Sequence, residues 1–317
     1  MKRIGILTRD CAGVNAAIRA VVRTAAQRGV EVLGVLKGYE GLIDGVTTPL
    51  TRRSVSGIIN LGGTVLKSAR SDRFLDAGWR RKAAESVRRL GVEGLVVVGG
   101  NGSLMAAHVF NAEHGLPVIG IPATIDNDVN GVDLALGADT ALNVALDALD
   151  KIRDTATSLE RIFVVEVMGR DCGWIALQVA LAGGCEEVLI PERSYDLDAI
   201  CAEIRAGNAE GKVSWIMIVA EGRTGAADIA RAVTEKTGFE TRVAVLGHIQ
   251  RGGRPTALDR IMAARLGHAA ADALLEGAAD KCVRLRNGAL DLWPLDKAVL
   301  PKTTPVEADY RLLKLLS

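Results

Sequence analysis

The chain has 317 residues, 49% of them hydrophobic but only 3% aromatic, and its 39 basic residues almost balance its 38 acidic ones. This length predicts two domains, each with its own core, and the even charge excludes a strong general attraction to nucleic acid or to membrane surfaces. Five cysteines without a CxxC pair indicate a reducing compartment, so we expect a cytoplasmic chain without a disulfide framework. The N-terminus enters a strand directly and the apolar runs are short, so no signal peptide or membrane segment is expected.

Short apolar runs alternate with longer amphipathic segments along the chain. In chain order, the pattern predicts strand 3–8, helix 14–27, strand 30–36, helix 79–90, strand 94–98, helix 103–113, strand 117–121, helix 141–155, strand 162–167, helix 172–181, strand 187–190, helix 197–206, strand 214–220, helix 226–237, strand 242–246 and helix 257–275. This alternation is typical of parallel βαβ units and predicts an α/β fold. Because the strands are too many for one simple sheet, we place a domain boundary near residues 137–141 and expect the site in the cleft between the two halves.

A glycine-rich turn follows the strand at 94–98 and opens the next helix. Its sequence is Val98-Gly99-Gly100-Asn101-Gly102-Ser103, so the backbone can approach a ligand closely and the helix N-terminus can present N–H groups to an anion. We expect Asn101 or Ser103 to cap this helix. A tight turn without a ligand explains the same residues equally well. The chain contains no GxxxxGK[ST] motif, which excludes a P-loop kinase.

Two carboxylates flank one amide directly after the strand at 117–121. The segment reads Pro122-Ala123-Thr124-Ile125-Asp126-Asn127-Asp128, and the carboxyl ends of strands in an open α/β sheet face the ligand crevice. Paired carboxylates suit a divalent cation and the removal of a proton from an alcohol. The alternative is an Asx-rich turn without chemistry, which we favour for this segment taken alone.

Four arginines lie at or near predicted strand ends: Arg161, Arg170, Arg242 and Arg251. Guanidinium groups bind phosphate through paired hydrogen bonds, so several arginines converging on one cleft predict a ligand that bears phosphate. Any one of them alone is better explained as a solvated surface charge. His248, close to Arg251, is by itself better explained as an ordinary core or surface histidine.

The segment 122–128 resembles the PGTIDND motif of the bacterial 6-phosphofructokinase family, phosphofructokinase A type. Further matching segments follow in the same order over nearly the whole chain, at 15–20, 62–64, 151–156, 165–170 and 238–253. The resemblance implies two Rossmann-like αβα domains with mainly parallel sheets and an active site in the cleft between them. It also implies a larger nucleotide-side domain at 1–138 that is completed by about 252–305, a sugar-phosphate-side domain at 139–251, and a C-terminal tail at 306–317.

The family's reaction is the ATP-dependent phosphorylation of fructose 6-phosphate to fructose 1,6-bisphosphate in glycolysis, with Mg²⁺ as cofactor. By resemblance, Asp126 is the base for the C1 hydroxyl, and Thr124, Asp128 and Arg170 belong to the same catalytic site. The residues that resemble those holding the sugar phosphate within one subunit are Met168, Gly169, Glu221, His248 and Arg251. Arg161 and Arg242 resemble two residues that reach in from a neighbouring subunit of a homotetramer. The nucleotide-side positions are Arg70, Ser71, Gly100, Asn101, Gly102 and Ser103.

The chain departs from the family on the donor side. The family's first loop reads LTSGGDxxGxNA, whereas this chain reads LTRDCAGVNA from Leu7, two residues shorter and without the paired glycines that approach the donor phosphates. Asn101 replaces the Asp of the family's GGDGS motif, so we expect a weakened Mg²⁺ site. Gly102 and the small Ala123 favour ATP, since pyrophosphate users carry Asp and Lys at these positions.

The family's effector site, which binds ADP or phosphoenolpyruvate between subunits, is only partly matched. The matching residues are Arg19, Arg23, Arg52, Arg153, Glu186 and Lys212, while Gly57 and Glu210 replace an acidic and a basic residue. Retained basic residues without regulation explain this set equally well. Two alternatives for the whole chain stay open: a pyrophosphate-dependent phosphofructokinase, and a donor-impaired regulatory paralogue that binds sugar phosphate.

Overall fold

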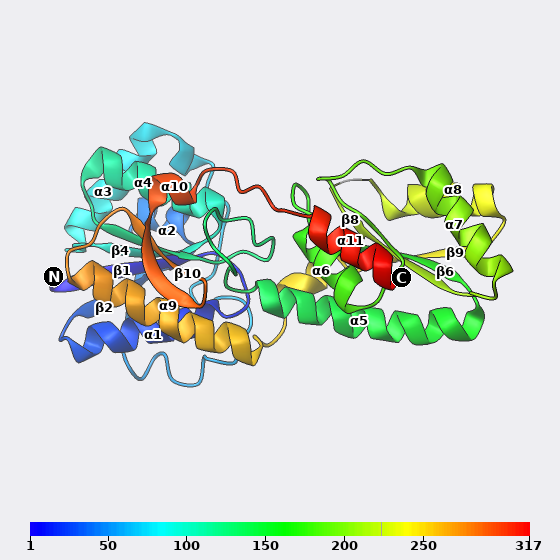
Figure 1. Ribbon diagram of the computed structural model, residues 1–317. Coiled ribbons are helices and arrows are strands. Elements are labelled where there is room, and N and C mark those ends of the chain that lie inside the picture. Colours follow the sequence, from blue (N-terminus) through cyan, green and yellow to red (C-terminus); the bar gives the residue numbers. More distant parts are fainter. Residues whose placement is uncertain (223) are drawn as a thin grey trace. The chain divides into compact units, whose positions relative to one another are not determined.

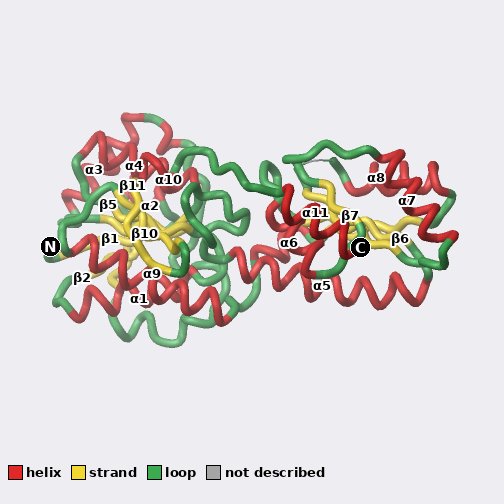
Figure 2. The backbone as a smooth tube through the Cα atoms, in the orientation of Figure 1, coloured by secondary structure: helices red, strands yellow, loops and turns green. Residues whose placement is uncertain are grey.

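The computed structural model describes residues 1–222 and 224–317 and divides the chain into two compact units. Unit 1 comprises Met1–Thr140 and Arg251–Thr303, and unit 2 comprises Ala141–Gln250 and Thr304–Ser317. Each unit contains one sheet with helices on both of its faces (Figure 1 and Figure 2). The chain therefore passes from one unit to the other three times, after residues 140, 250 and 303.

The sheet of unit 1 has seven strands in the order β11-β10-β5-β4-β1-β2-β3. The strands are β1 (Arg3–Thr8), β2 (Glu31–Val35), β3 (Thr47–Leu50), β4 (Leu95–Gly99), β5 (Val118–Pro122), β10 (Lys281–Arg286) and β11 (Ala289–Pro294). All neighbours are parallel except the two edge strands, β3 and β11. Pro49 is tolerated in β3 because an edge strand can spare a backbone donor.

Helices cover both faces of this sheet (Figure 1). They are α1 (Val14–Gln27), α2 (Tyr39–Asp44), α3 (Ala77–Arg89), α4 (Asn101–His114), α9 (Ala257–Leu275) and α10 (Leu295–Ala298), with the short 3₁₀ turn η1 (Arg73–Leu75). α1 packs closely against α9 on one face, where a Cβ at Gly267 would lie 2.7 Å from the carbonyl oxygen of Ala17. The opposite face carries the cluster of α2, α3, α4 and α10.

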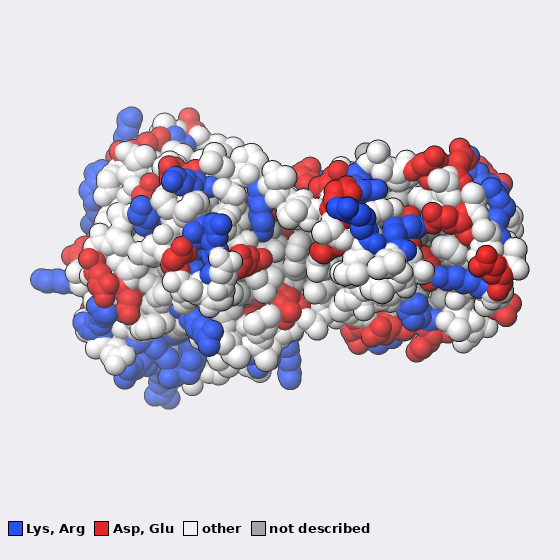
Figure 3. Space-filling view, in the orientation of Figure 1, with Lys and Arg blue, Asp and Glu red and all other residues white. Residues whose placement is uncertain are grey.

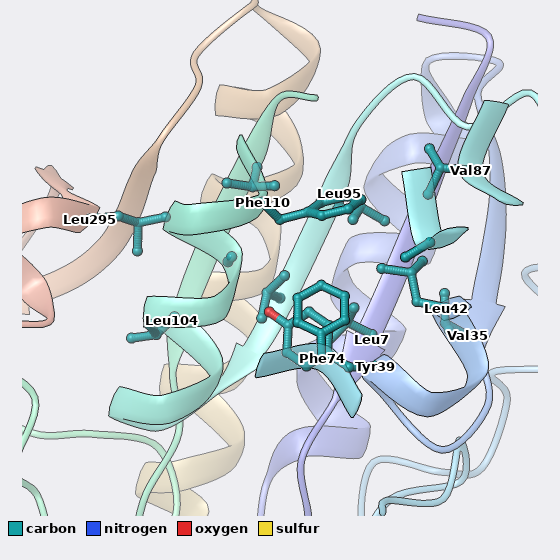
Figure 4. Packing of buried hydrophobic residues seen from close by; sticks show 14 of the residues in the cluster. Leu7, Val35, Tyr39, Leu42, Phe74, Val87, Leu95, Leu104, Phe110 and Leu295 are labelled. Carbon is teal, nitrogen blue, oxygen red and sulfur yellow. The ribbon is translucent and has the colours of Figure 1, made fainter. Parts of the chain in front are cut away.

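The core on that opposite face contains three neighbouring aromatic rings that are tilted against one another (Figure 4). The ring of Phe74 lies 4.1 Å from that of Tyr39 and 5.6 Å from that of Phe110, measured between centroids. Tyr39 is buried, so its hydroxyl needs a partner, and it donates a 2.7 Å hydrogen bond to the carbonyl oxygen of Ser103 in α4. This core thus fixes the first turn of α4, which carries the glycine-rich motif.

Unit 2 has a four-stranded, wholly parallel sheet in the order β7-β8-β6-β9. Its strands are β6 (Ile162–Val167), β7 (Glu187–Leu189), β8 (Trp215–Ala220) and β9 (Thr241–Val245), and its helices are α5 (Ala138–Leu159), α6 (Trp174–Ala182), α7 (Leu197–Ala209), α8 (Ala226–Thr237) and α11 (Glu307–Leu316). The helices α7 and α8 pack on β6 and β8 through a buried aliphatic cluster. The α/β class with mainly parallel sheets is confirmed.

Each strand and helix predicted from the sequence has a counterpart, with small shifts at the ends. Six regular elements were not predicted, namely α2, β3, β10, β11, α10 and α11. The segment at 306–317, expected as a tail, contains α11, which packs on α6 within unit 2. There the buried carboxylate of Glu187 accepts hydrogen bonds from the Tyr310 hydroxyl at 3.0 Å and from Lys314 Nζ at 3.3 Å.

Candidate active site

The strand order of unit 1 creates a natural ligand crevice. From β1 the chain continues to β2 on one side, whereas β4 lies on the other side of β1, so the loops after β1 and β4 diverge at this point. These loops and the segment after β5 line a pocket of about 540 Å³. The loops contribute Arg9–Cys11, Gly100–Ser103, Thr124–Asp126 and Asp128, so the glycine-rich and carboxylate motifs meet in one place.

The glycine-rich turn presents an uncapped helix N-terminus to this pocket. Gly100 is the N-cap residue of α4, and no side chain caps the helix, so our expectation that Asn101 or Ser103 would do so was wrong. The reason is that the Asn101 side chain is engaged elsewhere: its Nδ2 donates to Asp128 Oδ2 at 2.8 Å. A Cβ at Gly102 would meet no protein atom within 4 Å. The positive end of the helix therefore faces open space suited to an anion.

The carboxylate turn is rigidly built. Asn127 is buried, has a left-handed backbone with φ of 51°, and its side chain accepts from Ala135 N at 2.8 Å and donates to Asp133 O at 3.0 Å. Asp126 N donates to Thr124 Oγ1 at 3.2 Å. The side chains of Asp126 and Asp128 both line the pocket and are half-buried. The segment is therefore an Asx-rich turn that also carries two carboxylates into the pocket.

Two oxygen atoms near this turn have no hydrogen-bond partner within the described residues. They are Asn101 Oδ1 and Asp128 Oδ1, and both are buried. Buried oxygens of this kind usually have a partner, so each is a candidate ligand for a hard cation such as Mg²⁺. Outside residue 223, no group of three or more His, Cys, Asp or Glu side chains could hold a metal by itself.

The expected donor-side residues Arg70 and Ser71 line the same pocket as the glycine-rich turn. Ser71 is fixed by Glu40, whose carboxylate accepts from Ser71 Oγ at 2.5 Å and from Arg73 Nε at 2.8 Å. The hydrogen bonds from Arg73 and then from Ser71 hold the pKa of Glu40 below its usual range. Arg70 is largely exposed, which leaves its guanidinium accessible to a ligand.

The loop after β1 brings the side chain of Arg9 to the pocket. The guanidinium of Arg9 donates to the Ala69 carbonyl oxygen at 2.5 Å, which joins this loop to the segment that carries Arg70. Arg9 also packs against β4, because a Cβ at Gly99 would lie 3.0 Å from Arg9 Cγ. The loop therefore approaches the pocket through a charged side chain.

The expected sugar-phosphate residues of unit 2 gather at the carboxyl ends of its strands. Met168 N donates to the buried side chain of Gln250 at 2.8 Å, and Glu221 N donates to Val167 O at 2.9 Å. Gly169 has φ of 141°, and a Cβ there would lie 2.4 Å from the carbonyl oxygen of Cys172, so only glycine fits. Arg170, Glu221 and His248 are exposed at this end. Arg251, in contrast, lines the pocket of unit 1 that contains Asp126.

Arg161 and Arg242, which were expected to serve a neighbouring subunit, lie at the other edge of the unit 2 sheet from Arg170. Arg161 precedes β6 and Arg242 is the second residue of β9, so both lie at the amino ends of these parallel strands, opposite to Arg170. Both guanidinium groups contact Glu240, Arg161 Nε at 2.8 Å. The two ends of a parallel strand lie on opposite edges of the sheet, so an arginine near a strand can face either edge.

Three of the expected effector residues come together in unit 2. Lys212 Nζ lies 3.1 Å from Glu186 Oε1, and Glu186 Oε2 accepts from Ile216 N at 2.7 Å. Arg153 Nη2 donates to Gly184 O at 3.0 Å, two residues from Glu186. The others, Arg19 and Arg23 on α1 and Arg52 after β3, belong to unit 1.

Sequence reasoning missed several pocket residues. Tyr39, Phe74 and Leu75 line the pocket, and Glu40 fixes Ser71. Aromatic residues are scarce in this chain, so Tyr39 and Phe74 could have been singled out from the sequence on that ground. No feature of the sequence singles out Glu40. On the face drawn in Figure 3, basic and acidic side chains are interspersed over both units. Among the helices of residues 1–222 and 224–317, none is long and apolar enough to cross a membrane.

Curated relatives match the chain over its whole length. The phosphofructokinase of Bacillus subtilis, named ATP-dependent 6-phosphofructokinase, is 50% identical over 319 residues, covering 100% of both chains. The ATP-dependent 6-phosphofructokinase 1 of Thermus thermophilus is 50% identical over 321 residues, also with full coverage of both.

Solved structures match as well. The phosphofructokinase of Saccharomyces cerevisiae has a TM-score of 0.90 at 35% identity, over 94% of this chain and 45% of the yeast chain. A pyrophosphate-dependent phosphofructokinase from Marinobacter aquaeolei shares the fold, with a TM-score of 0.86 at 23% identity over 96% of this chain and 86% of that one. The family model described as Phosphofructokinase matches residues 3–274. Together with the full-length identity, this match shows that the chain belongs to the phosphofructokinase family.

Proposed function

We propose that this protein is an ATP-dependent 6-phosphofructokinase, which transfers the γ-phosphoryl group of ATP to the C1 hydroxyl of fructose 6-phosphate in glycolysis. The observation that carries this proposal is the 50% identity, over the whole chain, to bacterial enzymes of that name. The geometry of unit 1 agrees with it, since one pocket holds both a helix N-terminus suited to phosphate and a pair of carboxylates.

Phosphoryl transfer depends on positioning, charge neutralisation and a base rather than on covalent chemistry by the protein. We assign the base to Asp126, which accepts the proton of the C1 hydroxyl, with Thr124 and Asp128 beside it. The donor phosphates lie at the N-terminus of α4, with Gly100 to Ser103, Arg70 and Ser71 around them. This assignment rests on the common pocket of these residues.

The acceptor side of the proposal draws on unit 2. Residues assigned to fructose 6-phosphate are Met168, Gly169, Arg170, Glu221, His248 and Arg251. Arg161 and Arg242 are assigned to the site of a neighbouring subunit in a homotetramer, which is supported by their position at the opposite strand ends from Arg170. The assignment of ADP or phosphoenolpyruvate to Arg19, Arg23, Arg52, Arg153, Glu186 and Lys212, and of the protein to the cytoplasm, belongs to the same proposal.

Mg²⁺ fits the residues present. The orphaned oxygens Asn101 Oδ1 and Asp128 Oδ1 are neutral and anionic ligands of the type that Mg²⁺ accepts alongside phosphate oxygens and water. A bound Mg²⁺ would neutralise charge on the donor phosphates. Asn101 contributes no charge to it, so we expect weaker metal affinity than with Asp.

A pyrophosphate donor is not favoured. The pyrophosphate-dependent enzymes among the solved structures are only 20% and 23% identical to this chain and thus share its fold. Gly102 and the buried Ala123 both line the pocket, and the space in front of Gly102 is open. A nucleotide can therefore enter where a bulky residue would exclude it.

The test is the formation of fructose 1,6-bisphosphate from fructose 6-phosphate, measured with Mg²⁺ and either ATP or pyrophosphate. Turnover with ATP alone is expected, and turnover with pyrophosphate alone would refute the donor assignment. Asp126→Ala should abolish turnover while fructose 6-phosphate still binds in calorimetry. Full activity of Asp126→Ala would refute its role as base, and binding without turnover by the unmodified protein would indicate a regulatory chain.

A further inference from the structure

The turn that carries Asp126 is held from outside by a distant part of the chain. Residues 127–133 form hydrogen bonds with residues 284–302, which belong to the C-terminal portion of unit 1. This region was not connected with the site by the sequence motifs. Its contacts fall into two groups, one from the β10–β11 hairpin and one from the segment at 297–302, which we call the connector because the chain leaves unit 1 just after it.

The hairpin holds the far end of the loop. Buried Arg284 donates to the carbonyl oxygen of Gly131 at 2.9 Å, while its own charge is balanced by Asp291 at 2.7 Å. Asp133 is fixed twice, because its N–H donates to Leu285 O at 3.1 Å and its carboxylate accepts from the N–H at position 287 at 2.6 Å. These contacts lie five or more residues beyond Asp126 and anchor the loop to the sheet edge.

The connector holds the near end. Val129 and Pro301 form an isolated antiparallel bridge, and Asn130 N donates to Ala298 O at 3.2 Å. Most importantly, Lys302 Nζ donates to Asn127 O at 2.7 Å and to Val132 O at 2.8 Å. The ammonium group of Lys302 thus joins the two ends of the loop that follows Asp126.

The hydrogen bond from Lys302 to Asn127 lies between the two carboxylates of the pocket. Asn127 lies between the two pocket carboxylates of Asp126 and Asp128, and its backbone is left-handed, a conformation that Asn adopts more readily than other non-glycine residues. Several hydrogen bonds fix this conformation. The Asn127 side chain is fixed by Ala135 N and Asp133 O, and its carbonyl oxygen is fixed by Lys302.

We propose that Lys302 is a positioning residue for phosphoryl transfer, which holds the peptide between Asp126 and Asp128 so that the Asp126 carboxylate keeps its place in the pocket. This inference rests on the proposed function, in which Asp126 is the base. Lys302 does not line the pocket, so it acts through the turn and not on the substrates. Loss of its ammonium group should slow the chemical step and leave substrate binding nearly unchanged, because small displacements of a reacting group reduce rate strongly.

The experiment compares Lys302→Met with Lys297→Met in the full-length protein. Lys297 is a matched control, since it lies in the same connector but its ammonium group lies 5.4 Å from the ring centre of Trp293, and within the described residues it donates no hydrogen bond to residues 126–133. Rates are measured per folded chain with fructose 6-phosphate, ATP and Mg²⁺. Hydrogen–deuterium exchange of residues 125–136 is measured in the same samples without substrates.

For Lys302→Met we expect kcat to fall by about 10- to 100-fold, both KM values to change less than about two-fold, and exchange in residues 125–136 to rise. Lys302→Arg, which keeps a cationic donor, should recover part of kcat and would serve as the test if Lys302→Met does not fold. Normal kcat in Lys302→Met, an equal loss in Lys297→Met, or faster exchange without a loss of kcat would overturn the proposal. If the unmodified protein has no kinase activity, the proposed function fails. Unchanged exchange in Lys302→Met would separately overturn the proposal that Lys302 holds the turn.

Discussion

An acidic residue at position 101, as the resemblance to the family predicts for this position, should make the stability of unit 1 depend on Mg²⁺. In the protein, Asn101 Nδ2 donates to Asp128 Oδ2 at 2.8 Å and to the Asp128 carbonyl oxygen at 3.2 Å. Asn101→Asp replaces this donor with a carboxylate oxygen, so that two anionic groups face each other in a partly buried place. Without a cation between them, the contact changes from attractive to repulsive.

The size of the effect follows from the distance. Two unit charges about 4 Å apart interact by roughly 1 kcal/mol in water and roughly 4 kcal/mol at an effective dielectric constant near 20. Loss of the hydrogen bond adds about 1 kcal/mol. For a half-buried pair we therefore expect a loss of about 2–4 kcal/mol, which corresponds to a fall in Tm of roughly 5–10 °C for a unit of this size.

The assay is thermal unfolding in EDTA and in millimolar Mg²⁺. Asn101→Asp should melt below the unmodified protein in EDTA, and Mg²⁺ should raise its Tm more than that of the unmodified protein. The control is Asn111→Asp on the same helix, which removes a 2.8 Å hydrogen bond to Leu116 O and faces no carboxylate of the pocket. Equal melting of Asn101→Asp and the unmodified protein in EDTA, or an equal response of Asn111→Asp to Mg²⁺, would refute the reasoning.

Three further outcomes are expected. The hydrogen bond from Arg73 lowers the pKa of Glu40, so the stabilising effect of this carboxylate is present above its usual pKa of 4.5 and disappears as pH falls through the lowered value. In urea unfolding, Glu40→Gln should therefore lower the free energy of unfolding by about 1–2 kcal/mol at neutral pH, and by progressively less in acid. Asp259 is fully buried and accepts from Thr140 N at 2.9 Å and Thr140 Oγ1 at 2.5 Å, so Asp259→Ala should lower the free energy of unfolding by about 3 kcal/mol, and an unchanged urea midpoint would contradict this. All five cysteines are buried thiols, and burial raises the pKa of Cys11 to about 12, so a thiol reagent at mildly alkaline pH should react slowly with the native protein and with all five after unfolding.

The periodicity of apolar residues was sufficient for the layered part of the fold. β4 and β5 are unbroken apolar runs buried on both faces, and α1 carries apolar residues at helical spacing, so each could be recognised locally. Several of the elements that were missed are short, such as β3, or are edge strands such as β11, whose residues are mostly exposed. Their conformation is decided by the strand beside them, which a local pattern does not contain.

Part of the lining of the candidate pocket was predictable from the sequence, and its contacts were less so. Motifs at strand ends located Asp126 and the glycine-rich turn, because topology brings these ends together. The role of Asn101 was taken from its residue type as a helix cap, whereas the structure uses its amide to bind Asp128. Lys302 could not be found from the sequence, since its partners are 175 and 170 residues away.

The threefold passage of the chain between the units constrains how the protein can be made. Unit 1 has its sheet edge in β10 and β11 and its Asp126 turn held by residues up to 302, while unit 2 gains α11 only from the last residues. At about 5–20 residues per second, a ribosome thus synthesises residues 1–302 before either unit has all of its parts. Until then, β5 is an uncovered parallel edge with a free row of backbone groups, which is the kind of surface that pairs with other chains. Nascent chains of this protein are therefore expected to depend on chaperones, or on rapid pairing of β10 with β5 once β10 has been synthesised. Truncations that remove β10 and the residues after it should aggregate.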